Sequence, residues 1–187
     1  MATASQIANY SQRIYNTALA GTPDTPKGLP PVLAAILISQ AKHESGNFSS
    51  SAFVDGNNAF GYTYVPGAKW QTTTPGRIAD NGQPLATYAS LEDSTREVVD
   101  WIHRRQKEGK FPIDLTAITN TDQYAKLLKA AGYYGDSFEN YAKGLARWFV
   151  DMGKTVVNNP LAVAAVLLFL GGMTYVLITA KRTYIIK

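Results

Sequence analysis

The sequence predicts a mainly α-helical domain of the α+β class with a small β-hairpin, followed by one C-terminal transmembrane helix. Three observations lead to this fold class. Apolar residues recur at helical spacing along much of the first 154 residues, whereas residues 47–89 are rich in Gly, Asn, Ser, Thr, Tyr and Pro. Residues 155–180 contain no charged side chain. The chain therefore suggests two parts, a folded domain over 1–154 and an anchor with a short basic tail over 155–187.

Two helices are expected before residue 47. The first covers about residues 3–20, with apolar side chains at helical spacing (Ile7, Tyr10, Ile14 and Ala18). Gly and Pro in residues 21–28 indicate a loop. The second helix begins near Pro31 and ends at about Glu44, before a Ser-Gly-Asn stop signal. Its apolar positions run most of the way round the helix, so we expect it to be central and buried.

The middle of the chain contains strand-like runs. Residues 60–65 (FGYTYV) and 85–88 (LATY) are short runs of apolar and aromatic residues. Between them, residues 80–82 (Asp-Asn-Gly) are a turn signal. This pattern predicts a small hairpin.

Three further helices are expected after residue 89. The third starts at Ser90, whose spacing to Asp93 suits a helix cap, and stops at Gly109. The fourth covers residues 121–131. The fifth opens at residues 136–137, and its apolar stripe should face the core.

The stretch from residue 161 to residue 180 reads LAVAAVLLFLGGMTYVLITA. Twenty helical residues span ~30 Å, the thickness of the hydrocarbon core of a bilayer. The alternative is a buried core helix, but such helices rarely run this long without a charge. Residues 1–19 lack the features of a signal peptide. We therefore expect a single-pass membrane protein anchored at its C-terminus, with the lipid bilayer as a partner and the orientation left open.

Composition excludes several classes of function. The chain has no cysteine and only two histidines, which argues against a disulfide scaffold, a thiolate zinc site and a cysteine nucleophile. No metal or organic cofactor is expected. Residues 1–154 carry a net charge of only +1, fifteen basic against fourteen acidic side chains, and the remaining basic residues lie in the tail. A nucleic-acid-binding face is therefore not indicated.

Glu44 differs from the other acidic residues, most of which fall on polar helix faces. It ends the most hydrophobic helix of residues 1–154 and precedes the Gly-rich segment. Partial burial and the negative end of the helix dipole both raise the pKa of a carboxyl group. A carboxyl that stays protonated can give its proton to a leaving group, as glycoside hydrolysis requires. The alternative is that Glu44 bonds nearby backbone or pairs with Lys42 or His43.

Four sequence elements resemble one known group of enzymes. The elements, in chain order, are ISQAKHESGNF (38–48), GNNAFGY (56–62), YASLEDSTREVVDW (88–101), and AGYYGD followed by YAKGL (131–136 and 141–145). Together they resemble peptidoglycan-cleaving lysozyme-like enzymes. The second element is nearer to the bacterial N-acetylglucosaminidases of glycoside hydrolase family 73 than to the lytic transglycosylases. The resemblance covers roughly residues 30–148.

The resemblance implies a lysozyme-like fold with Glu44 as the general acid. It places Tyr133 beside the acid, where this side chain would orient the N-acetyl group or a water molecule; packing near a helix cap is the alternative. Asn58, Phe60 and Gly61 match the element that shapes the groove floor, although Phe60 could equally be core. We also consider as sugar-stacking platforms three aromatic residues, for which ordinary hairpin packing is the alternative: Tyr62, Tyr64 and Trp70.

The chain departs from the family pattern at the second carboxylate. The family usually carries one on the hairpin after the Phe-Gly element, but residues 71–77 hold no acidic side chain. Asp80 is the candidate replacement, and a plain turn residue is the alternative. If no second acid acts, either a held water attacks or the substrate's own group attacks, the latter with possible formation of an anhydro sugar.

These expectations combine into a membrane-anchored peptidoglycan hydrolase that cuts the β-1,4 glycan backbone in the endo-N-acetylglucosaminidase manner. The architecture suggests a virion enzyme of a membrane-containing bacteriophage, in the virion membrane or the bacterial inner membrane, with neighbouring virion or membrane proteins as partners. The alternatives are a lytic transglycosylase of the same superfamily, a non-catalytic membrane-anchored glycan-binding or structural virion protein, and a chitinase-like enzyme. The basic run at residues 103–107 is expected to be a solvated face, or a contact for an anionic wall polymer or lipid head groups.

Overall fold

The computed structural model describes residues 1–157, with side chains up to Asp151. The chain divides into two compact units, residues 1–148 and 149–187, and the site described below lies in the first. The elements are α1 (Ala4–Ala20), α2 (Pro31–Glu44), α3 (Ser51–Gly56), α4 (Leu91–Lys107), the 3-10 turn η1 (Leu115–Ala117), α5 (Thr121–Ala130) and α6 (Phe138–Val157).

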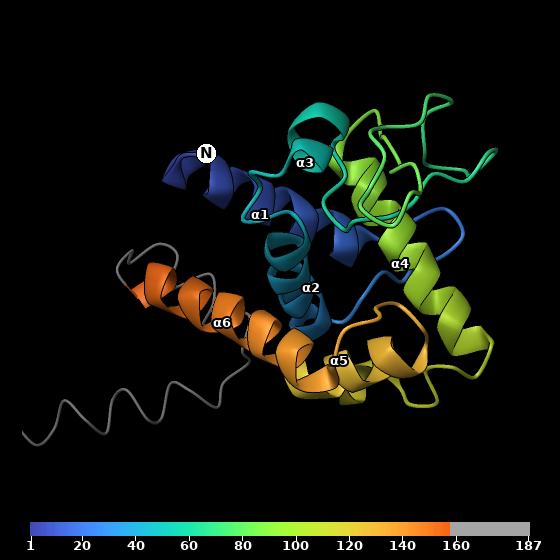
Figure 1. Cartoon of the computed structure of the whole chain (residues 1–187). Coiled ribbons are helices and arrows are strands. Elements are labelled where there is room, and N and C mark those ends of the chain that lie inside the picture. The colour runs from blue at the N-terminus through green and yellow to red at the C-terminus, as the bar shows by residue number, and fades with distance from the viewer. Residues whose placement is uncertain (158–187) are drawn as a thin grey trace, which may run out of the picture. The chain divides into compact units, whose positions relative to one another are not determined.

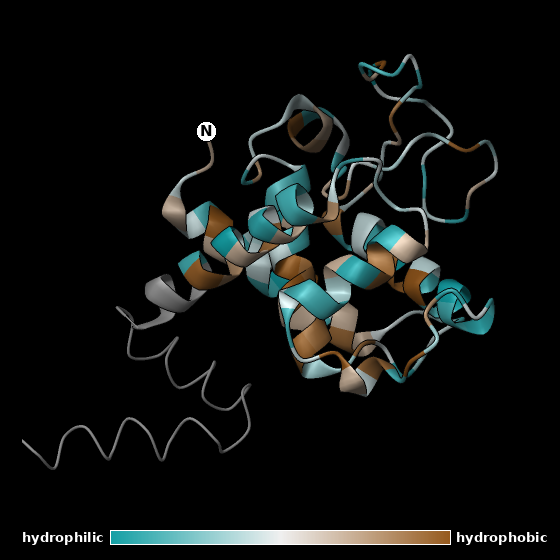
Figure 2. Ribbon diagram, turned by 60° about the horizontal axis from the view of Figure 1, so that its bottom comes forward, coloured by the Kyte–Doolittle hydropathy of each residue, from teal (hydrophilic) through white to brown (hydrophobic). Residues whose placement is uncertain are grey.

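Helix α2 is the centre of the first unit (Figure 1). It contacts α1, α5 and η1. Leu33, Ile36, Leu37 and Ala41 are fully buried, and even the polar Ser39 and Gln40 have no exposed surface. The expectation of a central buried helix is confirmed. In Figure 2 the outer helices instead carry hydrophilic and hydrophobic bands side by side, as helices with one buried face do.

Local signals account for the ends of the first two helices. Thr3 and Gln6 form a capping box at the start of α1. Gly21 ends α1 with φ of +72°, a conformation that a glycine adopts without strain. Pro31 opens α2, where its missing N–H costs nothing. After Glu44 the chain turns sharply, and Asn47 N–H donates to Lys42 O at 2.7 Å.

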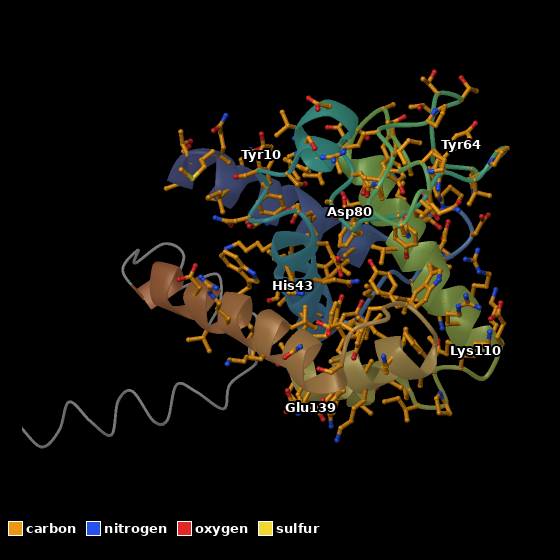
Figure 3. The ribbon with its side chains drawn as sticks, in the orientation of Figure 1. Tyr10, His43, Tyr64, Asp80, Lys110 and Glu139 are labelled. Carbon is orange, nitrogen blue, oxygen red and sulfur yellow. The ribbon has the colours of Figure 1, made fainter. Side chains whose placement is uncertain are left out.

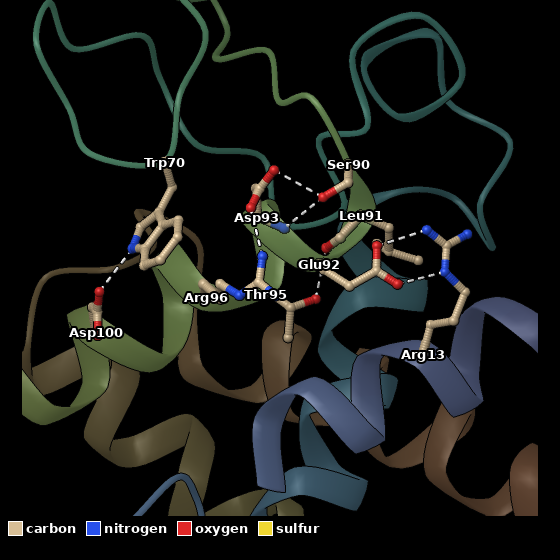
Figure 4. Close-up of polar contacts among 9 residues, drawn as sticks. All are labelled: Arg13, Trp70, Ser90, Leu91, Glu92, Asp93, Thr95, Arg96 and Asp100. Atoms are coloured by element: carbon tan, nitrogen blue, oxygen red, sulfur yellow. Dashed lines mark hydrogen bonds and ion pairs between the residues drawn. The ribbon is translucent and has the colours of Figure 1, made fainter. Parts of the chain in front are cut away.

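Helix α4 starts at the predicted cap and is tied to α1. The Ser90 hydroxyl accepts from Asp93 N–H at 3.1 Å. Arg13 of α1 binds Glu92 through two hydrogen bonds of 2.7 Å each, the bidentate geometry that arginine favours with a carboxylate (Figure 4). These contacts fix α4 as the wall on which the long loop 57–90 rests.

The predicted β-hairpin is wrong: no strand forms within residues 1–157. Loop 57–90 contains only three isolated bridges, Thr63–Leu85, Gln71–Tyr88 and Ile78–Pro84. The expected segments do meet, because Tyr64 N–H donates to Pro84 O at 2.7 Å and Ala86 N–H donates to Tyr62 O at 2.9 Å. Pro84 accepts from Tyr64 but has no N–H to donate in return, so the pairing cannot extend into a regular ladder.

The expected membrane-anchored fold and location are corrected as well. No helix within residues 1–157 is long and apolar enough to cross a bilayer, which contradicts the expectation of a single-pass anchored protein. The stretch 161–180, on which that expectation rested, lies outside the described residues. The mainly helical character of the chain is the part of the predicted fold class that stands.

Candidate functional site

Glu44 is the last residue of α2 and lies half-buried against α6. Its Oε1 accepts a hydrogen bond from the Tyr141 hydroxyl at 2.6 Å. Tyr141 is itself buried, with 4% of its surface exposed, so this bond is largely shielded from water. The ring of Tyr134 stacks on that of Tyr141 at 3.8 Å and nearly parallel. The carboxyl group is therefore held in one place by a rigid aromatic pair.

The surroundings keep a large share of the Glu44 carboxyl groups protonated near neutral pH. Burial raises its pKa from 4.5 to about 7, and the hydrogen bond from Tyr141 opposes this rise only in part. Burial disfavours the charged form because the protein interior solvates charge poorly, whereas a donor favours the carboxylate. A group with a pKa near the working pH suits general acid catalysis.

His43 supports the same contact from the neighbouring position. Its ring meets that of Tyr141 edge-on at 5.1 Å. A Cβ on Gly144 of α6 would lie 2.4 Å from the His43 ring, so only a glycine allows α6 this close to α2. Burial lowers the pKa of His43. These contacts give His43 a packing role, and Figure 3 shows it on α2 facing α6.

Loop 57–90 brings a second group of residues to Glu44. Gly61 has φ of +68°, and a Cβ there would lie 3.5 Å from Glu44 Oε2. Any other residue would be strained at this positive φ, and its Cβ would occupy the space in van der Waals contact with the carboxyl group. Gly61 thus leaves open the space directly beside the acid.

Tyr133 fastens this loop to the segment between α5 and α6. Its hydroxyl donates to Phe60 O at 2.6 Å. Burial and the nearby charge of Glu44 raise the pKa of Tyr133 well above its ordinary value, so the phenol stays neutral. The ring meets Tyr62 edge-on at 5.8 Å and Trp101 at 5.2 Å. Tyr133, Tyr62 and Gly61 therefore lie around the acid.

The side chains of Asn58 and Phe60 are buried and support the loop beside the acid. The Asn58 amide is buried and donates to Tyr62 O at 2.8 Å and to Ala86 O at 3.0 Å. Its oxygen accepts from Tyr62 N–H at 3.2 Å. The Phe60 ring is 1% exposed, so it belongs to the core and offers its carbonyl, not its face. Both residues shape the loop beside the acid.

Within residues 1–151, Trp70 and Asp80 form no hydrogen bond with Glu44, Tyr133 or Gly61. Trp70 Nε1 donates to Asp100 Oδ2 of α4 at 2.7 Å, and its ring lies near Lys69 and Arg96 (Figure 4). Asp80 is exposed in the turn that Gly82 N–H closes on Ala79 O at 2.9 Å. It has no hydrogen bond or ion pair within residues 1–151. The Tyr64 hydroxyl donates a hydrogen bond within the loop, to Thr73 O at 3.0 Å.

Sequence reasoning missed Tyr141 and Glu97. Tyr141 was one member of an apolar helix stripe, and only its alignment with the YAKGL element could have marked it. Glu97 was placed on a solvated face, but it lies half-buried under loop 57–90, where Gln71 Nε2 donates to its Oε1 at 2.9 Å. Burial raises its pKa. In the described residues no group of three or more acidic, His or Cys side chains is arranged to hold a metal.

Comparisons with known proteins bear on the family and the fold of the chain. A glucosaminidase family model, described as mannosyl-glycoprotein endo-β-N-acetylglucosaminidase, matches residues 30–154. The glycoside hydrolase domain of Salmonella typhimurium FlgJ is 19% identical, covers 86% of this chain and 97% of its own, and has a TM-score of 0.55. A C-terminally truncated form of that domain is 20% identical, with coverage of 79% and 98% and a TM-score of 0.54.

A third solved structure is similar to a lesser degree. It is a type VI secretion system effector–immunity complex from Pseudomonas protegens, with 20% identity, coverage of 77% of this chain and 86% of that chain, and a TM-score of 0.50. At such identities the likeness shows a shared fold alone. No curated protein sequence matches the chain.

Proposed function

The chain belongs to the glucosaminidase family and is therefore a glycosidase, and on this premise we propose that it cuts the β-1,4 glycan backbone of peptidoglycan in the endo-N-acetylglucosaminidase manner. Glu44 is the general acid in this proposal. One observation carries it: a carboxyl group at the end of the central helix, held by Tyr141 at 2.6 Å and with a pKa of about 7.

The reaction starts with proton transfer from Glu44 to the oxygen of the scissile glycosidic bond. The carbon–oxygen bond breaks as the proton arrives, the leaving sugar departs with a hydroxyl group, and positive charge develops at the anomeric carbon. The carboxylate left on Glu44 is stabilised by the Tyr141 hydroxyl, which already donates to it. The space beside Gly61 is where the glycan would meet the acid.

Tyr133 can act toward the substrate in one way only. A hydroxyl has one proton to donate and two lone pairs to accept, and here the proton is used on Phe60 O. Its oxygen can therefore accept from an acetamido N–H of the sugar or from the attacking water. Asn58 and Phe60 then serve by holding this loop, and Tyr62 lines the same side of the site.

Glu44 is the only carboxyl group that takes part in the proposed reaction. Asp80, the candidate for the second carboxylate, lies exposed at a turn. Two routes then complete the reaction. Attack by a water molecule, whose proton passes to the Glu44 carboxylate and restores the acid, gives a reducing N-acetylglucosamine end. Intramolecular attack by the substrate's own hydroxyl gives the anhydro sugar of a lytic transglycosylase.

Digestion of purified cell walls by Glu44→Gln tests the proposal. We expect loss of at least about 100-fold in activity with the fold intact, because general acid catalysis is worth that much or more. Glu139→Gln is the matched control, since Glu139 is an exposed carboxylate on α6 that has no role in the site. Wall clearing by the Glu44→Gln variant at the wild-type rate would refute the assignment of Glu44 as the general acid.

Mass analysis of the fragments released by the wild-type chain identifies the bond that is cut. A reducing N-acetylglucosamine end supports the glucosaminidase, and an anhydro product assigns the transglycosylase route. Pelleting with walls and no release of fragments would favour a glycan-binding protein over an enzyme.

A further inference from the structure

Gln40 is a buried polar residue of α2 that has no part in the reaction described above. It has no exposed surface and lies one helical turn before Glu44, so the two side chains project from the same face of the helix. Tyr124 of α5 and Tyr141 of α6 meet this face and are also buried. The polar atoms of a buried amide have to be satisfied by such neighbours.

The two ends of the Gln40 amide face different tyrosines. The Tyr124 hydroxyl donates to Gln40 Oε1 at 2.7 Å, and because an amide oxygen only accepts, this bond fixes the orientation of the amide. Gln40 Nε2 is buried and has no hydrogen-bond partner of ordinary length within residues 1–151. It faces the Tyr141 hydroxyl. Burial raises the pKa of Tyr141, and the Gln40 side chain opposes that rise, as a donor to the phenol oxygen does.

This contact directs the proton of the Tyr141 hydroxyl. A hydroxyl group has one proton and two lone pairs, and here the proton is donated to Glu44 Oε1 at 2.6 Å. An amide N–H at the phenol oxygen favours a lone pair on that side and repels the hydroxyl proton. A reversed amide would instead present Oε1, which would compete with Glu44 for the same proton. The orientation of Gln40 therefore favours donation from Tyr141 to Glu44.

The direction of that hydrogen bond decides which oxygen of Glu44 carries the acidic proton. Oε1 accepts from Tyr141, so in the protonated acid the proton lies on Oε2. Oε2 is the oxygen beside Gly61, where a Cβ would lie 3.5 Å away, and so it borders the open space proposed for the glycan. If the Tyr141 hydroxyl turned, Glu44 could place its proton on Oε1 and donate it to Tyr141, away from the substrate.

We propose that Gln40 is a positioning residue for the general acid: held by Tyr124, it orients the Tyr141 hydroxyl toward Glu44 and so keeps the acidic proton on the oxygen that faces the substrate. The inference rests on the proposed function and makes it more specific. Gln40 is fully buried, so it does not touch the glycan. It acts on Glu44 through Tyr141, since burial and the Tyr141 hydrogen bond are what shift the pKa of Glu44.

Other titratable or charged side chains also lie near this carboxyl group and its tyrosine. They are His43 of α2, Tyr62 of loop 57–90, and Tyr133, Tyr134, Asp136 and Glu139 before and on α6. Burial lowers the pKa of His43 and raises the pKa of each of the three tyrosines, so all four favour their neutral forms. The variants described next leave all six residues in place.

The test measures the pKa of Glu44 directly, from the NMR chemical shift of its carboxyl carbon in a pH titration of the full chain, with Glu44→Gln to assign the signal. Gln40→Met removes the amide and keeps an unbranched side chain, and Tyr124→Phe frees the amide to turn. Each should raise the pKa by about 0.5 pH unit, because Tyr141 becomes a weaker or misdirected donor to the carboxylate. Ser39→Ala is the control. It removes a buried hydroxyl from the adjacent position of α2 and should leave this pKa unchanged.

A combination with Tyr141→Phe separates positioning from packing. If Gln40 acts through Tyr141, Gln40→Met shifts the pKa of Glu44 in the wild-type background and causes no further shift in the Tyr141→Phe background. A packing effect would appear in both. In kinetics on solubilised wall fragments, kcat of Gln40→Met should fall about fivefold at pH values where Glu44 is protonated, with KM within about twofold of wild type, because Gln40 does not contact the substrate.

Several results would overturn the proposal. They are an unchanged pKa of Glu44 in a folded Gln40→Met or Tyr124→Phe chain, an equal shift in the Tyr141→Phe background, a similar shift in Ser39→Ala, or a rise in KM with kcat unchanged. If Gln40→Met does not fold, Tyr124→Phe decides by the same titration, alone and combined with Tyr141→Phe. If the wild-type chain cuts no cell wall, the proposed function fails, whereas the NMR titration still decides whether Gln40 orients Tyr141.

Discussion

Replacement of Tyr141 by Phe removes one hydroxyl group and keeps the buried ring. That hydroxyl donates to Glu44 Oε1 at 2.6 Å, and the ring stacks on Tyr134 at 3.8 Å. The packing of α6 on α2 should therefore survive the change. The Glu44 carboxylate loses its donor and the Gln40 side chain loses the hydroxyl that it also contacts, so the change acts on the charged form of the proposed acid.

The expected effect is an alkaline shift of the pH profile. The Tyr141 bond lowers the pKa of Glu44, which burial raises to about 7, so its loss lets the pKa rise further. A hydrogen bond to a charged group is worth about 1.5–3 kcal/mol, and 1.36 kcal/mol corresponds to one pH unit. We therefore expect the alkaline limb of activity to move up by about 1 to 2 pH units.

The assay is the pH dependence of kcat/KM on solubilised wall fragments, which reports the ionisation of the free enzyme. The matched control is Tyr134→Phe, because the Tyr134 hydroxyl donates to Ala125 O at 3.0 Å and does not touch Glu44. The control should keep the wild-type limb. An unchanged or acid-shifted limb in a folded Tyr141→Phe chain would refute the role given to this hydrogen bond.

Two further predictions concern the same site. Gly61→Ala and Gly67→Ala both place a side chain at positive φ, and each should cost about 1–2 kcal/mol of stability in thermal unfolding. Only Gly61→Ala adds a Cβ 3.5 Å from Glu44 Oε2, so only this variant should also lower kcat/KM. Equal activity in the two variants would contradict the proposed open space beside the acid. Between pH 4.5 and about 7 the folded chain binds more protons at Glu44 than the unfolded chain does, so this group makes stability fall as pH rises through that window. Glu44→Gln removes the free-energy cost of ionising this buried carboxyl group. Denaturant titration should therefore find the variant more stable than wild type at pH 8, by up to about 3 kcal/mol, and about as stable as wild type at pH 4. A variant less stable than wild type at pH 8 would count against the raised pKa of Glu44.

The long helices were predictable because their signals are local. Apolar spacing, the cap at Ser90 and the proline at the start of α2 each act within a few residues, and α1, α2, α4 and α5 begin and end within about two residues of the expected positions. Helix α3 was missed. It has only six residues, and it is held by a distant contact in which Phe53 packs on Tyr10 of α1 at 5.0 Å.

The prediction of a β-hairpin was wrong because, as for α3, the outcome depends on contacts between residues that are distant in the chain. The two segments were correctly expected to meet, but a regular antiparallel ladder needs every second residue to exchange hydrogen bonds with its partner. Pro84 interrupts that exchange, and the side chain of Asn58 takes part in holding the Tyr62 and Ala86 backbone instead. Whether paired segments extend into a ladder depends on such tertiary contacts, which residue propensities do not contain.

That a carboxyl group ends a hydrophobic helix next to a glycine-rich loop can be read from the sequence, because both features depend on neighbours in the chain. The glucosaminidase motifs can be read there too. Which groups surround that carboxyl depends on how the chain folds. Tyr141 is 97 residues away along the chain, and Tyr133 reaches Phe60 across 73. The pKa of Glu44 depends on burial and on these distant partners, and no local pattern specifies either.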